Sequence, residues 1–159
     1  MNLKYSMDKV DFVKKAIVEV LIHLGVEALV EVRFDKDTNI VFVNIDGEDL
    51  GNLIGYHGEN IVALRNIILT SLLTKFEGPV SLSIDVANYR NRREEKLKDI
   101  AKKVAETVLR TKKSQKLSPM TSIDRRVIHA EISTNFPELV SYSVGEGRDR
   151  RIIISQSEL

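Results

Sequence analysis

Two glycines, Gly55 and Gly58, enclose two residues between apolar stretches that have helical spacing. A helix that ends at one glycine and restarts at the next leaves backbone N–H groups without partners at the start of the second helix. Those groups and the positive end of the helix dipole attract an anion such as a phosphate, and glycine lets a nucleic-acid backbone come close. The spacing predicts a phosphate-binding loop, with a plain helix-breaking turn as the alternative.

The side chains inside this loop are those of Tyr56 and His57, and Ile54 precedes it. A tyrosine ring can stack on a base, and a protonated histidine can donate a hydrogen bond to a phosphate. Neither side chain carries a permanent positive charge. We therefore expect this loop to bind a nucleic-acid backbone more weakly than a loop with basic residues at these positions.

Arg125 and His129 form a second candidate pair, with Arg126 beside them. Four residues apart, the pair would lie about 40° apart around one helix face, which predicts contacts to phosphates or bases. The alternative is structural. Ile128 and Ile132 lie near the same side, so the helix can be largely packed and His129 can be a partly buried hydrogen-bonding residue.

Further arginines lie in two short clusters that can also contact phosphate. The clusters consist of Arg90, Arg92 and Arg93, and of Arg148, Arg150 and Arg151. The alternative for the first cluster is a solvated helix face whose partners are Glu94 and Glu95. Gly145 and Gly147, before the second cluster, most simply form a hairpin turn because two glycines permit positive φ.

Charge is distributed unevenly along the 159 residues, although the formal net charge is only +1. Residues 1–87 contain 8 Lys and Arg against 13 Asp and Glu, whereas residues 88–159 contain 16 against 10. An acidic half followed by a basic half predicts two domains, the second better suited to a polyanion.

The composition also argues against several classes of function. The chain has no cysteine, which excludes disulfides and thiolate metal sites and suits the cytoplasm. Its apolar runs are too short to span a bilayer, so we expect no membrane insertion. The three histidines are widely separated, and nucleophile, P-loop and paired acid–base motifs are missing. We therefore expect no catalytic residue, no cofactor and no metal.

Apolar periodicity predicts the elements that would position the first site. Gly25 makes a good helix stop, and the turn at 35–39 joins two strands into a hairpin. The expected elements are a helix over 10–24, strands over 28–34 and 40–45, a helix over 59–75 that carries Ile61, Leu64, Ile67, Ile68 and Leu72, and a strand over 80–86.

The second half predicts a charged helix from about Tyr89, a strand over 112–117, a helix that ends near Ser133, and strands over 139–144 and 151–154. Thr121 and Asp124 resemble a capping box in which Asp replaces Glu. The charged helix from about Tyr89 has an apolar stripe of Leu97, Ile100, Ala101, Val104 and Val108. The helix that ends near Ser133 has an apolar stripe of Ile123, Val127 and Ala130.

The glycine loop, with Ile54 before it and helices on both sides, resembles the backbone-clamping loop of KH domains. Over residues 7–87 the order of elements resembles the bacterial type II KH arrangement. The pattern of Arg125 and His129 with three residues between them resembles the motif of the R-3-H domain, a small module that binds single-stranded nucleic acid. The flanking text agrees, with Leu117-Ser118-Pro119-Met120 before the helix and Ser143-x-Gly145-Glu146-Gly147-x-x-Arg150-Arg151 after it.

The two modules in this order, joined by Tyr89-Arg90-x-Arg92-Arg93-Glu94-Glu95, resemble the bacterial Jag family, whose members are also called KhpB, EloR or SpoIIIJ-associated proteins. That family usually has a further N-terminal domain and a linker, whereas we expect the KH-like helix of this sequence to begin almost at Met1, so functions that depend on the further domain are not carried over. The resemblance implies an α+β chain: a type II KH-like domain with a three-stranded sheet over 1–87, and a small R-3-H-like α/β domain over 88–159.

In function, the resemblance implies a non-catalytic, cytoplasmic protein that binds single-stranded or loop RNA. The glycine loop would clamp a few nucleotides of backbone, and the bases would lie in a groove beside the adjoining helices. The implied role is post-transcriptional regulation linked to cell elongation or division, with a small single-KH protein or a second copy of the chain as candidate partners. The alternative is a scaffold whose acidic first half binds protein while the second half binds RNA or single-stranded DNA.

Overall fold

The computed structural model describes the backbone of residues 3–157 and the side chains of residues 8–157. It divides into two compact units, of which the first ends at Tyr89 and the second begins at Arg90. The charge pattern predicts a boundary two residues earlier, between residues 87 and 88. No helix in the described part of the chain is long and apolar enough to cross a bilayer.

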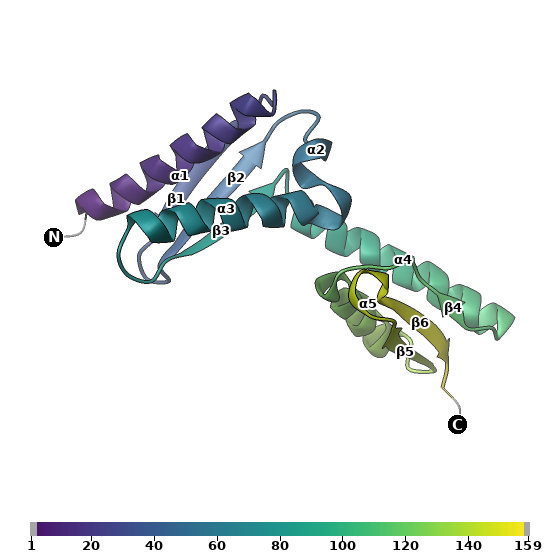
Figure 1. Cartoon of the computed structure of the whole chain (residues 1–159). Coiled ribbons are helices and arrows are strands. Elements are labelled where there is room, and N and C mark those ends of the chain that lie inside the picture. The colour runs from purple at the N-terminus through teal and green to yellow at the C-terminus, as the bar shows by residue number, and fades with distance from the viewer. Residues whose placement is uncertain (1–2, 158–159) are drawn as a thin grey trace. The chain divides into compact units, whose positions relative to one another are not determined.

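The first unit is a three-stranded sheet with helices on one face, as Figure 1 shows. In chain order its elements are α1 (Leu3–His23), β1 (Leu29–Asp35), β2 (Ile40–Asp46), α2 (Gly51–Ile54), the 3-10 turn η1 (Tyr56–Gly58), α3 (Glu59–Lys75) and β3 (Ser81–Val86). The strands lie in the order β1-β2-β3, with β1 and β2 antiparallel and β2 and β3 parallel. The predicted hairpin and the expected order of elements are confirmed.

The predicted helix stop at Gly25 is confirmed, and its physical basis is visible. Gly25 has a φ of +64°, and its N–H bonds to the carbonyl of Ile22 at 3.1 Å while the N–H of Val26 bonds to that of Leu21 at 2.9 Å. These two bonds form a Schellman cap, which only a left-handed residue completes.

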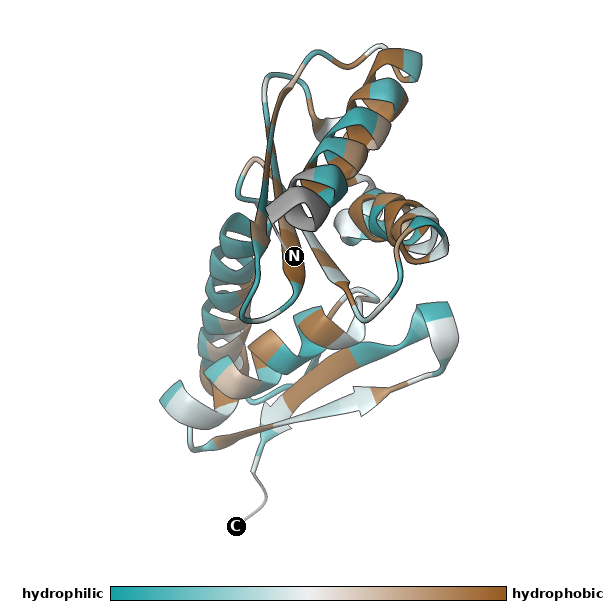
Figure 2. Ribbon diagram, turned by 90° about the vertical axis from the view of Figure 1, so that its left-hand side faces the viewer, coloured by the Kyte–Doolittle hydropathy of each residue, from teal (hydrophilic) through white to brown (hydrophobic). Residues whose placement is uncertain are grey.

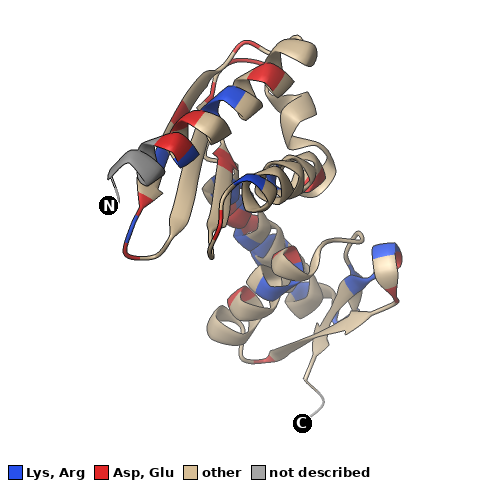
Figure 3. Cartoon of the chain, turned by 60° about the vertical axis from the view of Figure 1, so that its left-hand side comes forward, with Lys and Arg blue, Asp and Glu red and all other residues tan. Residues whose placement is uncertain are grey.

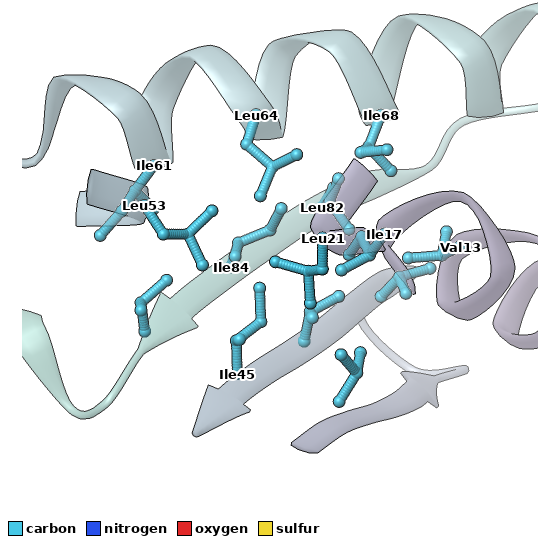
Figure 4. Close-up of a cluster of buried hydrophobic side chains, with 14 of the residues drawn as sticks. Val13, Ile17, Leu21, Ile45, Leu53, Ile61, Leu64, Ile68, Leu82 and Ile84 are labelled. Carbon is cyan, nitrogen blue, oxygen red and sulfur yellow. The ribbon is translucent and has the colours of Figure 1, made fainter. Parts of the chain in front are cut away.

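The core of the first unit lies between the sheet and the helices α1 and α3 (Figure 4). From the helices it takes Val13, Ile17 and Leu21, and Ile61, Leu64, Ile68 and Leu72; from the central strand it takes Val41, Val43 and Ile45. Ile67 lies on the same helix, as expected, but its side chain is 61% exposed and does not join the core. At 100° per residue, it lies roughly a quarter-turn from the buried stripe.

The second unit has the elements α4 (Tyr89–Thr111), β4 (Gln115–Lys116), α5 (Ser122–Asn135), β5 (Leu139–Val144), the 3-10 turn η2 (Gly147–Asp149) and β6 (Arg151–Gln156). Its antiparallel sheet has the strand order β4-β6-β5. The core joins Leu97, Ala101, Ala105 and Val108 of α4 to Ile128 and Ile132 of α5 and to Leu139, Ile152 and Ile154 of the sheet. Figure 2 shows hydrophobic residues along the helices and strands of both units.

Three details of the second unit differ from the predictions. Ala105 is buried, whereas Ile100 and Val104 are only half-buried. On α5 the side with Ile128 and Ile132 is packed, and Ile123 is 75% exposed. The strand expected over 112–117 is shorter, Gln115–Lys116, because α4 extends to Thr111 and Lys112 has a φ of +61°; beyond the strand, the Leu117 N–H still bonds to the Ile152 carbonyl at 2.9 Å.

The predicted cap of α5 is confirmed for the hydrogen bond of the Thr121 side chain. The Thr121 hydroxyl accepts a hydrogen bond from the N–H of Asp124 at 3.2 Å. The carboxylate of Asp124 accepts a 2.8 Å bond from Arg93, so it links α5 to α4.

Candidate nucleic-acid interface

The glycine loop joins two helices through a run of left-handed backbone. The single turn α2 ends at Gly55, which has a φ of +72°, and α3 begins after Gly58, which has a φ of +83°. Between them His57 also has a positive φ of +54°. The ψ of Gly55, −174°, places it in a region that essentially only glycine adopts, whereas the left-handed conformation of Gly58 favours glycine without requiring it, as the neighbouring His57 shows.

The protein's own side chains lie directly behind both glycines. A Cβ on Gly55 would come within 2.5 Å of Asn60, and one on Gly58 within 2.7 Å of the Tyr89 ring. The Asn60 amide also donates to the Asn52 carbonyl at 2.8 Å, which ties α3 to α2. The sequence suggests that glycine is present because a ligand approaches closely. These internal contacts give a second reason for glycine at both positions. Neither Asn60 nor Tyr89 was a predicted contributor to the loop.

The outer surface of the loop is formed by Tyr56 and His57. Their rings stack with centroids 4.0 Å apart and planes inclined by 20°. Tyr56 is 66% exposed, whereas Ile54 is half-buried and packs against the core. The stacked pair therefore places one aromatic face at the surface, next to the start of α3.

At the start of α3, the backbone favours binding of an anion and one side chain disfavours it. Its cap residue, Gly58, has no side chain to bond the N–H groups of the first turn. Glu59, however, places a carboxylate in that turn, which repels a phosphate. The loop's attraction for phosphate therefore rests on backbone N–H groups and is partly offset.

In the second unit, α5 and β5 bring Arg125 and His129 together over two serines. One ring nitrogen of His129 lies 2.7 Å from the Ser141 hydroxyl and the other 3.1 Å from the Ser143 hydroxyl. The Arg125 guanidinium donates to the same Ser143 hydroxyl at 2.9 Å. The two serines were not predicted contributors, although strand alternation places 139, 141 and 143 on one face.

This arrangement makes His129 a poor cation at neutral pH. Burial, and after it the positive charge of Arg125, lowers the pKa of His129 below the ordinary value of 6.5. The ring is therefore neutral near pH 7, with one nitrogen donating and the other accepting. Arg125 supplies the permanent charge, and His129 supplies hydrogen bonds and position.

A hollow of about 460 Å³ lies beside His129 on the same edge of the second unit. It is lined by Arg126, His129, Ala130, Ile132, Ser133, Leu139, Val140 and Ser141. Half of the lining residues are polar and half are apolar, and the hollow is open to solvent.

The other predicted arginines fall into different settings. Arg93 is held by Asp124, with side chains only 18% and 7% exposed, so it ties two helices together. The guanidinium of Arg151 bonds to the carbonyl of Asp149 at 2.8 Å. The remaining predicted arginines, Arg90, Arg92, Arg126, Arg148 and Arg150, lie on the surface. Figure 3 shows the many basic residues along α4.

Family models match both halves of the chain. Residues 11–84 match the KH domain of KhpA and KhpB, and residues 95–156 match the R-3-H domain. The chain is similar to the RNA-binding protein KhpB of Clostridium symbiosum, with 35% identity over 79% of this chain and 56% of that protein. It is 38% identical to KhpB of Bacillus subtilis, over 79% of this chain and 61% of that protein.

The match to KhpB of Lactiplantibacillus plantarum is 32% over 87% of this chain and 42% of that protein. The chain thus spans 56% to 61% of the length of the first two relatives. The predicted α+β class is confirmed, and so is the resemblance on which it rested. The chain therefore carries, in tandem, a KH domain of the KhpA/KhpB family and an R-3-H domain, the arrangement of the KhpB type.

Proposed function

We propose that this chain binds single-stranded or loop RNA, without catalysis, through the glycine loop of the KH domain and the Arg125–His129 face of the R-3-H domain. The observation that carries the proposal is the fixed shape of the loop, which presents the exposed Tyr56 ring beside the N-terminus of α3. The relatives' name, RNA-binding protein KhpB, supports the ligand class.

In this proposal the KH loop holds a short piece of backbone. A base stacks on Tyr56, and the first N–H groups of α3 receive the adjoining phosphate. The loop needs little reorganisation on binding because Asn60 and Tyr89 already support it from within. The neighbouring bases lie beside α2 and α3.

The R-3-H domain supplies most of the electrostatic attraction. Arg125 and Arg126 contact phosphates at the α5 face, and Arg148 and Arg150 contact them near the turn η2. Neutral His129 donates or accepts a hydrogen bond at the edge of the hollow. Arg90 and Arg92 extend the basic surface along α4, whereas Arg93 acts mainly by holding the domain together.

The test compares two single charge changes in the full chain. Tyr56→Asp places a carboxylate at the loop, and Asn39→Asp places one at the exposed turn between β1 and β2, where the φ of +54° suits Asp. Binding of a short fluorescent single-stranded RNA is followed by anisotropy, with thermal melting as the check on folding. We expect Tyr56→Asp to weaken binding severalfold and Asn39→Asp to leave it unchanged. Equal affinities in folded variants would exclude the loop from the site.

A scaffold is the second candidate function, favoured by the acidic exposed face of the first sheet, which carries Glu31, Asp46 and Asp85. In that case the KH domain binds protein and only the R-3-H domain binds RNA or single-stranded DNA. The same assay separates the two functions when Arg125→Gln is added. The scaffold requires that Arg125→Gln weakens binding while Tyr56→Asp does not.

The biological role follows from the family resemblance. We propose post-transcriptional regulation in the cytoplasm, linked to cell elongation or division, with a small single-KH protein or a second copy of this chain as partner. Sedimentation of the purified chain, alone and with such a protein, measures both associations directly.

A further inference from the structure

The sheet of the R-3-H domain has an outer face on the side opposite to α4 and α5. Along β5 the residues Leu139, Ser141 and Ser143 face the helices, and along β6 Ile152 and Ile154 are buried in the core. Alternation sends the remaining strand residues to the outer face. They are Lys116 from β4, Val140, Tyr142 and Val144 from β5, and Arg151, Ile153 and Ser155 from β6.

Strand register sets these side chains in rows. Tyr142 lies opposite Ile153, and Ile153 lies opposite Lys116, so one row crosses the sheet from an aromatic ring to a cation. The next row pairs Val144 with Arg151. Tyr142 is 47% exposed and Val140 is 42% exposed, so this apolar surface is open.

The charged side chains that the strands contribute to this face are positive, and the carboxylate of Asp149, in the adjoining turn, lies 3.6 Å from the Arg151 guanidinium. Lys116 and Arg151 are the only charged side chains in the three strands, which contain neither Asp nor Glu (Figure 3). The turn η2, between β5 and β6, adds Arg148 and is followed by Arg150, with Asp149 between them. An exposed aromatic ring between cations suits a ligand that has flat bases and a phosphate backbone.

We propose that this outer face, centred on Tyr142 with Lys116 and Arg151, is a base-stacking platform for single-stranded RNA. It is separate from the Arg125–His129 face, because Ser141 and Ser143, which hold those two residues, point to the other side of β5. The platform rests on the proposed RNA-binding function and extends it to a second surface of the same domain.

A second copy of the chain is the competing occupant, since Val140, Tyr142 and Ile153 form an apolar centre. In a two-fold pairing, however, each face would meet its own cations, and Lys116 and Arg151 would repel their counterparts. RNA phosphates would neutralise the same cations. Charge complementarity therefore favours RNA.

The full chain contains no tryptophan, which makes a direct test of stacking available. Tyr142→Trp places a single fluorescent ring on the proposed platform, and Ile22→Trp places one at a site that is 70% exposed on α1, outside every proposed contact. We expect a short unlabelled single-stranded RNA to quench the tryptophan emission of the Tyr142→Trp variant and to leave that of the Ile22→Trp variant unchanged.

Affinity gives the second measurement, by anisotropy with a labelled RNA. Tyr142→Ala should weaken binding about five- to tenfold, because one stacked base is lost. Tyr142→Phe should bind as the wild type does, since stacking needs the ring and not the hydroxyl. Thermal melting checks that each variant is folded.

Three results would overturn the platform, and they are distinguishable. If wild-type chain binds RNA while the Tyr142→Trp variant is not quenched and Tyr142→Ala binds normally, the platform is wrong and the proposed function stands. If wild-type chain binds no single-stranded RNA, both are wrong. If Tyr142→Ala converts a dimer to a monomer in sedimentation without RNA, the face is a self-association surface.

Discussion

The two sheets of this chain share a plan but present opposite surfaces. Each has three strands with helices on one face. On the outer face of the KH sheet, strand alternation places Glu31, Asp35, Asp46 and Asp85 against a single cation, Arg33. The corresponding face of the R-3-H sheet has two cations and no carboxylate. Charge, rather than architecture, decides which sheet can meet a polyanion.

The aromatic residues on the two faces differ in the same way. Phe42 on the KH sheet lies 4.1 Å from the guanidinium of Arg33, so the chain's own cation already covers the ring. Tyr142 on the R-3-H sheet is nearly half exposed. Under the proposed function, RNA would therefore contact the KH domain at its loop, whereas it would contact the R-3-H domain both at the Arg125–His129 face and at the outer face of the sheet.

The candidate sites are also held by different means. The KH loop is fixed by backbone conformation and by contacts of Asn60 and Tyr89 with the glycines. The Arg125–His129 pair is fixed by hydrogen bonds to Ser141 and Ser143. The first site should therefore be sensitive to a single added methyl group, and the second to changes in charge.

The largest effect is expected from Gly58→Ala, which tests whether backbone shape holds the KH loop. The new Cβ combines a left-handed φ with a collision against the Tyr89 ring, so the free energy of unfolding should fall by about 2 to 3 kcal/mol. Gly78→Ala is the matched control, because Gly78 has a φ of +90° but open space around it. That control should lose only about 1 kcal/mol, measured by urea unfolding.

A double variant isolates the collision. In Gly58→Ala with Tyr89→Ala the ring is removed, so the combined loss should be smaller than the sum of the two single losses. Additive losses, or equal losses for Gly58→Ala and Gly78→Ala, would show that the Tyr89 contact does not constrain the loop.

Sequence patterns predicted those parts of the fold that depend on neighbours along the chain. Gly25 and Thr121 are examples, because a helix stop and a cap depend on residues within one turn. The strand pairing of the hairpin followed in the same way from the turn at 35–39.

Contacts between distant segments were not predictable in this way. Arg93 and Asp124 are 31 residues apart, and the sequence offered Glu94 as the partner for that cluster, whereas Glu94 bonds to Lys98. Tyr89 is similarly distant in sequence from Gly58, the loop residue against which its ring packs. Tertiary packing within each unit brings these groups to their partners, and no periodicity in one segment encodes it.

The contrast in charge between the two outer sheet faces predicts a difference in how RNA affinity depends on salt, an effect of intermediate size among these predictions. Lys116→Gln should reduce the slope of log affinity against log salt by about 0.7, the value for one phosphate contact with a single strand. Arg33→Gln removes a cation from the acidic KH face and should leave the slope unchanged. Anisotropy titrations of the full chain at several salt concentrations measure both. Equal reductions would mean that attraction for RNA is diffuse and that the two faces are equivalent.

The smallest effect concerns pH and the way in which the second site is held. The pKa of His129 is lowered in the folded chain, so below about pH 6.5 the unfolded chain binds more protons than the folded one. Stability from the neutral ring is therefore complete above that pH and is lost progressively as pH falls towards the folded pKa. His129→Gln keeps a hydrogen-bonding group but removes the titration, and it leaves the other two histidines in place.

The measurement is the difference in melting temperature between wild type and His129→Gln at about pH 7.5 and at about pH 5.5, on either side of the unperturbed pKa. The wild type should lose more stability on acidification than the variant does. A wild type that instead gains stability in acid would mean that protonated His129 has an anionic partner in the folded chain. With a neutral ring, the attraction for phosphate that we propose for the R-3-H domain rests on its arginine and lysine side chains.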